Sequence, residues 1–289
     1  MITDREFIKN TMPARGSYAN KYSVGTLLCI CGSYSMAGAA ILSAKAALRM
    51  GAGLVRVAVP ESIYPIVSAA VPEAVFLVLP DGKDGTIDAR YAKEIISAAN
   101  KCDAVLMGCG SKLCEDTKSL VLSLLYHAEV PLILDADGIN ALSKHINVLK
   151  DRVYSTVLTP HTGEMSRLTG LSTEGILGDR ENVAQTFADD YGVTLVLKGK
   201  DTLIASPGEE LIQNPTGNAG MAVAGSGDVL AGMIASLVAQ GAPLRDASAT
   251  GAYLHGLAGD IGAEELSEYS LLPTDITDRI PKAIMECLK

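Results

Sequence analysis

Short apolar runs alternate along the chain with longer stretches in which apolar positions recur at helical spacing. Between the runs, helical spacing predicts helices at Ala37–Met50, Ala89–Asn100, Glu115–His127 and Gly178–Tyr191. Strands that are apolar throughout and separated by helices are typical of a parallel sheet covered on both faces. The pattern predicts an α/β fold with a mostly parallel central sheet. The predicted strands are Thr26–Cys31, Leu54–Val59, Ala74–Leu79, Ala104–Met107, Leu132–Asp135, Thr156–Thr159, Thr194–Leu197 and Leu203–Ala205.

The last third of the chain differs in composition and in its pattern of apolar residues. From Gly227 to about Gly262 the sequence is helical and rich in small residues such as Ala249, Gly251 and Gly256. Because small side chains let helices approach closely, this segment predicts a tightly packed helical layer. No low-complexity tract, linker or short repeat divides the chain, so we expect a single domain over residues 1–289.

Charge and hydropathy narrow the class of protein. The chain carries 24 Lys+Arg against 33 Asp+Glu, a net charge of −9, and only 4% aromatic residues. This acidic balance, with no basic run, argues against nucleic acid as a partner. No apolar stretch reaches the roughly 18 residues of a membrane span without a glycine or a charge, and Met1–Arg15 lacks the apolar core of a signal peptide. We therefore expect no membrane partner and a cytoplasmic location.

The cysteines give no sign of a metal centre. None of the six pairs at C-x-x-C spacing, and the four histidines are scattered. Structural zinc needs clustered ligands at turn-forming spacing, so this pattern favours buried thiols of a reducing compartment.

The most informative segment is Asn218–Gly232, which contains Gly225-Ser226-Gly227-Asp228 directly before the apolar run Val229–Val238. Two glycines at a helix start allow close approach of a ligand, and the free N–H groups with the helix dipole favour phosphate. A carboxylate at Asp228 would repel that phosphate unless it acts as a base or shares a metal. The alternative is a helix cap, a role worth roughly 0.5–2 kcal/mol.

Other glycine-rich or polar segments follow predicted strands, and each has a plain alternative as a turn or a helix cap. Gly32–Ala40 is a strand-to-helix turn that lacks the Lys of a phosphate-binding P-loop. The remaining four are Gly108–Lys112, Asp135–Gly138, Pro160–Glu164 and the hairpin-like Lys198–Thr202. In open α/β sheets ligands bind beyond the carboxyl ends of the strands. The segments therefore predict one crevice for a phosphorylated ligand, without naming a reaction.

Taken together, these segments resemble the ADP-dependent NAD(P)H-hydrate dehydratase family, which has the ribokinase-like fold. The resemblance implies an enzyme, a hydro-lyase of nicotinamide nucleotide repair that removes water from the S-epimer of NADH-hydrate or NADPH-hydrate. It also implies ADP as co-substrate, Mg²⁺ as cofactor, and release of AMP and phosphate. The matching stretches are GSYSMAGAAILSAKAALRMGAGLV at 32–55, LILDADGINAL at 132–142, LTPHTGEMSRL at 158–168, LKGKDT at 197–202 and NPTGNAGMAVAGSGDVLAG at 214–232.

The resemblance also implies roles for individual residues. Asp228 matches the residue at the reacting hydroxyl, which would act as general base. Mg²⁺ would have no direct protein ligand, and Glu164 or Asp135 would bind it through water molecules. The implied contacts to the hydrated dinucleotide are Ala39, Gly110, His161 and Asp228; to the nucleotide, Lys198, Gly199, Lys200, Asp201, Thr202 and Gly227; to the transferred phosphoryl group, Gly225, Ser226 and Gly227.

Some points depart from the family or stay open. The family usually has Gly-Pro-Gly-Leu-Gly where this chain has Gly108-Cys109-Gly110-Ser111-Lys112. The epimerase domain often fused to the family is not expected before Gly25, and family habit implies a homotetramer. Two alternatives use the same turn: a small-molecule kinase of the same fold, and a non-catalytic nucleotide-binding module in which Asp228 only caps its helix.

Overall fold

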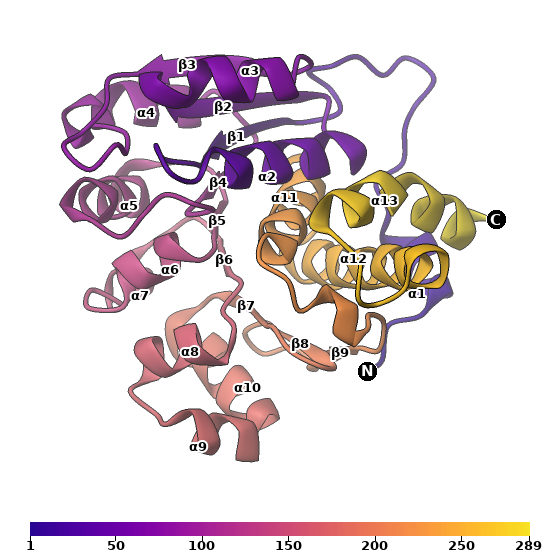
Figure 1. Ribbon diagram of the computed structural model, residues 1–289. Helices are drawn as coiled ribbons and strands as arrows, with labels where there is room; N and C mark the ends of the chain where they lie inside the picture. The colour runs from indigo at the N-terminus through magenta and orange to yellow at the C-terminus, as the bar shows by residue number, and fades with distance from the viewer.

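The computed structural model describes all 289 residues and contains a nine-stranded sheet in the order β3-β2-β1-β4-β5-β6-β7-β8-β9 (Figure 1). The strands from β1 to β7 are parallel, and at one edge β8 pairs antiparallel with both β7 and β9. The fold class predicted from the sequence is confirmed. The strands are β1 (Thr26–Ile30), β2 (Leu54–Pro60), β3 (Val75–Leu79), β4 (Ala104–Met107), β5 (Leu132–Leu134), β6 (Thr156–Leu158), β7 (Thr194–Leu197), β8 (Thr202–Ala205) and β9 (Ile212–Asn214).

Each central strand sends alternate side chains into two separate apolar cores. In β1, Leu27 and Cys29 belong to one core, and Leu28 and Ile30 to the other. Burial on both faces explains why the strands read as unbroken apolar runs.

One face of the sheet is covered by the helices that come first and last in the chain (Figure 1). Gly232 of α11 lies so close to the Ser43 carbonyl of α2 that a side chain there would collide with it. The small residues of the last third therefore do form the tight helical layer that their spacing predicts. These helices are α1 (Arg5–Thr11), α2 (Ala37–Arg49), α3 (Tyr64–Ala70), α11 (Ser226–Ala239), α12 (Leu244–Leu266) and α13 (Pro273–Leu288).

The middle of the chain supplies the helices of the opposite face. They bury the second core, built around residues such as Leu124 and Ile139. They are α4 (Ala92–Ala99), α5 (Glu115–His127), α6 (Asp137–Leu142), α7 (Val148–Asp151), α8 (Thr162–Thr169), α9 (Thr173–Gly178) and α10 (Arg180–Tyr191); single 3₁₀ turns occupy Glu61–Ile63, Ala89–Tyr91 and Ala219–Met221.

The helical stretch predicted from Gly227 to Gly262 is in fact two helices. The chain leaves α11 through Gly241, which has a positive φ of 89°, and re-enters helix after Pro243, the N-cap of α12. Proline lacks the N–H of a helix interior but suits a helix start, so the break falls at this point. No helix of the structure is both long enough and apolar enough to cross a membrane.

Candidate active site

The carboxyl ends of the parallel strands and the first turn of α11 meet at one place. Cys109 follows β4, Asp135 follows β5, and Asp228 lies in the first turn of α11. The thiol sulfur and one carboxylate oxygen from each aspartate all lie within 4.8 Å of one another. Residues that are far apart in the sequence thus form one compact polar cluster.

A lysine whose side chain is only 18% exposed supplies the positive charge of this cluster. Lys198, at the end of β7, places its Nζ 2.7 Å from Asp135 Oδ1 and 3.8 Å from Glu164 Oε2. Thr159 Oγ1 donates to the same Asp135 oxygen at 2.6 Å. Burial by itself lowers the pKa of Lys198, but Asp135 and Glu164 outweigh it and raise the pKa above the ordinary lysine value. The lysine is therefore charged and held inward against the two carboxylates.

Asp228 has the electrostatics of a proton acceptor. Burial is the main cause that raises its pKa to about 6, and the negative charge of Asp135 adds to the rise. The Cys109 thiol and Lys198 oppose it. No backbone N–H of α11 donates to the Asp228 carboxylate, and the N-cap position belongs to Gly225. The geometry thus gives no support to a capping role for Asp228.

The start of α11 presents free donors beside that carboxylate. Gly225 has a φ of 99°, a left-handed conformation that glycine adopts without strain. The N–H groups of Gly227 and Asp228 have no acceptor within the chain. A side chain at Gly227 would come within 3.4 Å of Lys198 Nζ, so the donors and the lysine face the same small space. That space suits an anion.

The predicted dinucleotide contacts fall into two groups. Gly110 (φ 62°) packs directly on Ala39 at the start of α2, and a side chain there would approach the Ala39 methyl within 2.6 Å. Ser33 Oγ donates to the Gly110 carbonyl at 2.8 Å and fixes this contact. His161 is the exposed N-cap of α8 and forms a capping box with the buried Glu164.

The Lys198–Thr202 segment is the turn between the antiparallel strands β7 and β8, so the predicted hairpin is present. Lys198 points into the site, whereas Gly199 and Lys200 are exposed. Arg180 of α10 fixes the turn by donating from Nη1 to the Lys200 carbonyl at 2.6 Å and from Nη2 to the Leu197 carbonyl at 3.3 Å. Sequence reasoning missed this arginine, since a single Arg in a polar helix carries no pattern.

A second residue that sequence reasoning missed lies beneath the start of α11. His255, in the middle of α12, is buried, and its Nε2 lies 3.3 Å from Ser226 Oγ. Burial is the main cause that lowers the pKa of His255 to about 4, so the ring is neutral. The other three histidines of the chain are exposed.

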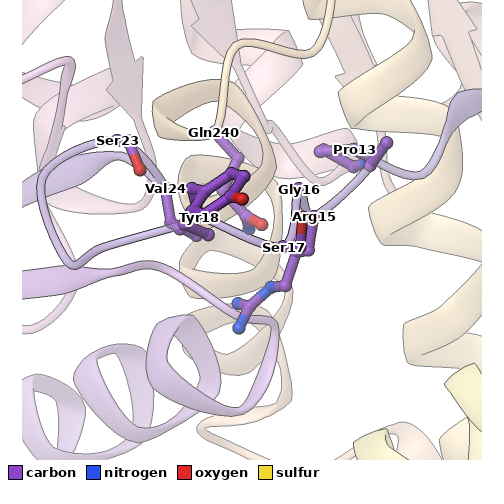
Figure 2. A pocket seen from close by; sticks show the side chains of 10 residues that line it. Pro13, Arg15, Gly16, Ser17, Tyr18, Ser23, Val24 and Gln240 are labelled. Atoms are coloured by element: carbon purple, nitrogen blue, oxygen red, sulfur yellow. The ribbon is translucent and has the colours of Figure 1, made fainter.

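Two cavities lie outside this cluster. One, of about 320 Å³, is formed by the N-terminal segment and Gln240 (Figure 2), next to the carboxyl end of α11 and therefore far from Asp228. The other, of about 500 Å³, lies between the start of α5, α6 and α8, and its lining includes Lys118, Lys144 and Arg167. Arg167 Nε donates to Asn140 Oδ1 at 2.7 Å. Its lining includes Leu113, three residues after Gly110, and Arg167 of α8, the helix that His161 caps.

With this geometry established, comparison with known proteins decides the family. A model of the NAD(P)H-hydrate dehydratase family matches residues 27–282. The chain belongs to the NAD(P)H-hydrate dehydratase family. The resemblance drawn from its motifs is thereby confirmed, and so is the ribokinase-like form of the α/β fold.

Similar proteins agree with this assignment. The chain is 38% identical to a bifunctional NAD(P)H-hydrate repair enzyme of Moorella thermoacetica, over 94% of this chain and 52% of that protein. It is 32% identical to the ADP-dependent (S)-NAD(P)H-hydrate dehydratase of Bacillus subtilis, over 96% of this chain and 95% of that protein. A crystal structure of an ADP/ATP-dependent NAD(P)H-hydrate dehydratase from B. subtilis, co-crystallised with ATP and Mg²⁺, matches with a TM-score of 0.83 and 29% identity, covering 98% of this chain and 97% of the other. The chain spans about half the length of the bifunctional NAD(P)H-hydrate repair enzymes that it matches.

Proposed function

We propose that residues 1–289 act as a single dehydratase domain that uses ADP to dehydrate the S-epimer of NADH-hydrate or NADPH-hydrate, restoring NAD(P)H and releasing AMP and phosphate. The observation that carries the proposal is the position of Asp228: a partly buried carboxylate with a pKa of about 6, beside unpaired N–H donors at the start of α11. Phosphoryl transfer to an alcohol requires a base and a binding site for the transferred anion. Here both lie on one helix turn, and we call the turn Gly225–Gly227 the anion cradle.

The reaction follows in two steps. Asp228 takes the proton of the ring hydroxyl as that oxygen attacks the terminal phosphorus of ADP, and the bond to AMP breaks. The phosphate ester formed on the ring then leaves as inorganic phosphate, and loss of a ring proton restores the double bond of NAD(P)H. Gly227 N–H and the charged Lys198 offset the negative charge that develops on the transferred group. Gly225 and Ser226 complete the cradle.

The two ligands would occupy opposite sides of Asp228. The AMP part of the nucleotide would lie along the Lys198–Thr202 turn. In this turn the exposed Gly199 can contribute its backbone groups, and the exposed Lys200 its positive charge. The hydrated ring would lie between Ala39, Gly110 and His161. The cavity lined by Lys118, Lys144 and Arg167 also contains Glu115, which pairs with Lys118, and the charges of Lys144 and Arg167 that remain suit the phosphates of a dinucleotide.

The acidic residues present fit a magnesium ion held through water rather than by direct ligation. Asp135 Oδ1 already accepts from Lys198 and Thr159, and Glu164 Oε2 accepts from the His161 N–H at 2.9 Å. Asp135 Oδ2 accepts only from the Cys109 thiol, at 3.7 Å, and Glu164 Oε1 lies 3.4 Å from His161 Nε2, so both oxygens could also accept from waters of an ion carried by the nucleotide phosphates. Bound there, Mg²⁺ would supply charge neutralisation of the phosphates.

We further propose a cytoplasmic location and a homotetrameric assembly. The six free cysteines, five of them buried, fit the reducing conditions of the cytoplasm. A homotetramer follows from family habit, and light scattering on the purified chain would test it.

The experiment that tests the proposal incubates acid-hydrated NADH with the protein, Mg²⁺ and either ADP, ATP or no nucleotide. We expect the absorbance band of reduced nicotinamide to recover with ADP, and AMP to appear at the same rate. Recovery with ATP alone would overturn the nucleotide assignment. Accumulation of a stable phosphorylated alcohol, with no recovery of the band, would instead identify a small-molecule kinase.

A further inference from the structure

The loop that leads into α11 is anchored on α12 by a series of polar contacts. Thr216 Oγ1 donates to the Tyr253 carbonyl at 2.8 Å, and the Gly217 N–H donates to Asp260 Oδ2 at 3.0 Å. Gly256 makes this approach possible, because a side chain there would collide with Thr216. The middle of α12 is therefore a rigid base for the phosphate cradle.

His255 is the one ionisable group on this base that reaches the cradle itself. Its Nε2 lies 3.3 Å from Ser226 Oγ, and both residues are only 7% exposed. Ser226 is the first residue of α11, directly before the free N–H groups of Gly227 and Asp228. A buried imidazole touching the first residue of an anion cradle has no part in the reaction described above.

The hydrogen bond between the two side chains can run in either direction, and the direction has a chemical consequence. If the imidazole Nε2 accepts from Ser226, the hydroxyl proton is used up and only oxygen lone pairs face the anion. If Nε2–H donates to the Ser226 oxygen, the hydroxyl proton is free for a phosphoryl oxygen. Since a neutral histidine carries a single N–H, its tautomer decides which arrangement exists.

We propose that His255 is a positioning residue that donates from Nε2–H to Ser226 Oγ and thereby presents the Ser226 hydroxyl as a third donor to the transferred phosphoryl group. The proposal rests on the dehydratase function proposed above. Burial, the main cause, lowers the pKa of His255 to about 4 against a hydrogen bond to the Ser226 backbone that raises it, and the charge of Lys198 adds to the lowering, so the ring is neutral at neutral pH. The donor is therefore permanent rather than pH-gated.

Steady-state kinetics on four full-length variants test the role. His255→Leu removes the donor, Ser226→Ala removes the hydroxyl, and their double variant removes both. We expect each single variant to lower kcat about 10- to 100-fold with a small change in KM for ADP, as for loss of one donor to a charged transition state. The double variant should be no slower than the slower single variant. His255→Gln, whose Nε2 can donate from a similar position, should recover most of the rate.

Ser248→Ala is the matched control. Ser248 lies on the same helix, fully buried, and its hydroxyl has no hydrogen-bond partner. Its removal should leave kcat unchanged, which shows that α12 tolerates a substitution in its core. Full activity of His255→Leu, or effects of His255→Leu and Ser226→Ala that multiply in the double variant, would overturn the proposal.

The tautomer can be read independently of turnover. Side-chain nitrogen NMR of the full chain should show His255 neutral and protonated at Nε2. Protonation at Nδ1 would contradict the proposal even if the variants are slow. If the wild-type protein forms no AMP from ADP and hydrated cofactor, the proposed function fails, whereas the NMR result still decides the hydrogen bond.

Discussion

Replacing Asp228 with asparagine should make the protein more stable while abolishing turnover. The folded state holds this carboxyl in a place where its charge is unfavourable, because burial and Asp135 raise its pKa from the ordinary 3.8 to about 6. Each pKa unit is worth about 1.4 kcal/mol, so the ionised side chain costs the folded state about 3 kcal/mol at neutral pH. An uncharged amide avoids this cost but finds fewer hydrogen-bond partners. We therefore expect a net gain of about 1–3 kcal/mol.

The sign of the pH dependence sharpens the test. A carboxyl whose folded-state pKa is raised binds its proton more tightly in the folded protein. Below about pH 4 the carboxyl is protonated in both states, and wild type and Asp228→Asn should differ little. As the pH rises from about 4 to above 6, wild type should lose stability relative to the variant. Urea unfolding at pH 4.5 and pH 8, about the ends of this window, measures the difference.

Asp246→Asn provides the matched control, because Asp246 occupies the same third position of α12 that Asp228 occupies in α11. At that position the helix dipole stabilises the carboxylate, so loss of its charge should lower the free energy of unfolding by about 0.3–1 kcal/mol. If Asp228→Asn also reduces stability at pH 8, Asp228 is an ordinary helix-start aspartate and the reasoning from burial is refuted.

Three further predictions follow from the same cluster. The pH profile of kcat/KM should fall on its acidic side with a midpoint near pH 6, where Asp228 takes up a proton; a midpoint near pH 4 would contradict the geometry. Lys198→Met should destabilise the fold by about 3–5 kcal/mol in thermal or urea unfolding, because Asp135 loses its buried counter-charge, and a loss below about 1 kcal/mol would contradict the buried pair. Cys109→Ala should move the acidic midpoint to higher pH, because the Cys109 thiol lowers the pKa of Asp228. Cys31→Ala, which removes a neighbouring buried thiol, should leave the midpoint unchanged. Equal midpoints in the two variants would show that Cys109 does not act on Asp228.

The central strands were predictable because burial on both faces leaves an unbroken apolar run, and the edge strand β3 keeps such a run although Val75 and Val78 are exposed. The exception is β9, Ile212–Asn214, which is three residues long and contains two amides. It pairs at the edge of the sheet, and only the pairing with β8 makes it a strand. The short helices α6 to α9 were equally hidden, since four to eight residues hold too few turns to display a period.

The residues of the site also fall into those that the sequence reveals and those that only the structure reveals. Glycines and acids placed directly after strands mark the crevice, and so Asp228, Asp135 and Lys198 could be named from the sequence. Arg180 and His255 could not. Each acts through one or two contacts to residues 17 to 29 positions away, which leave no local pattern. Such supporting residues become visible only when the packing is known.

The central claim is that the ring hydroxyl becomes a phosphate ester before it leaves. A heavy-oxygen label in the hydroxyl of hydrated NADH tests it directly, with the released phosphate analysed by mass spectrometry. We expect the label to appear in inorganic phosphate, one atom for each reduced nicotinamide recovered. Label found in water, with unlabelled phosphate released alongside AMP, would show that ADP is cleaved without phosphorylating the substrate and would contradict the role of Asp228 as the base that activates the ring hydroxyl.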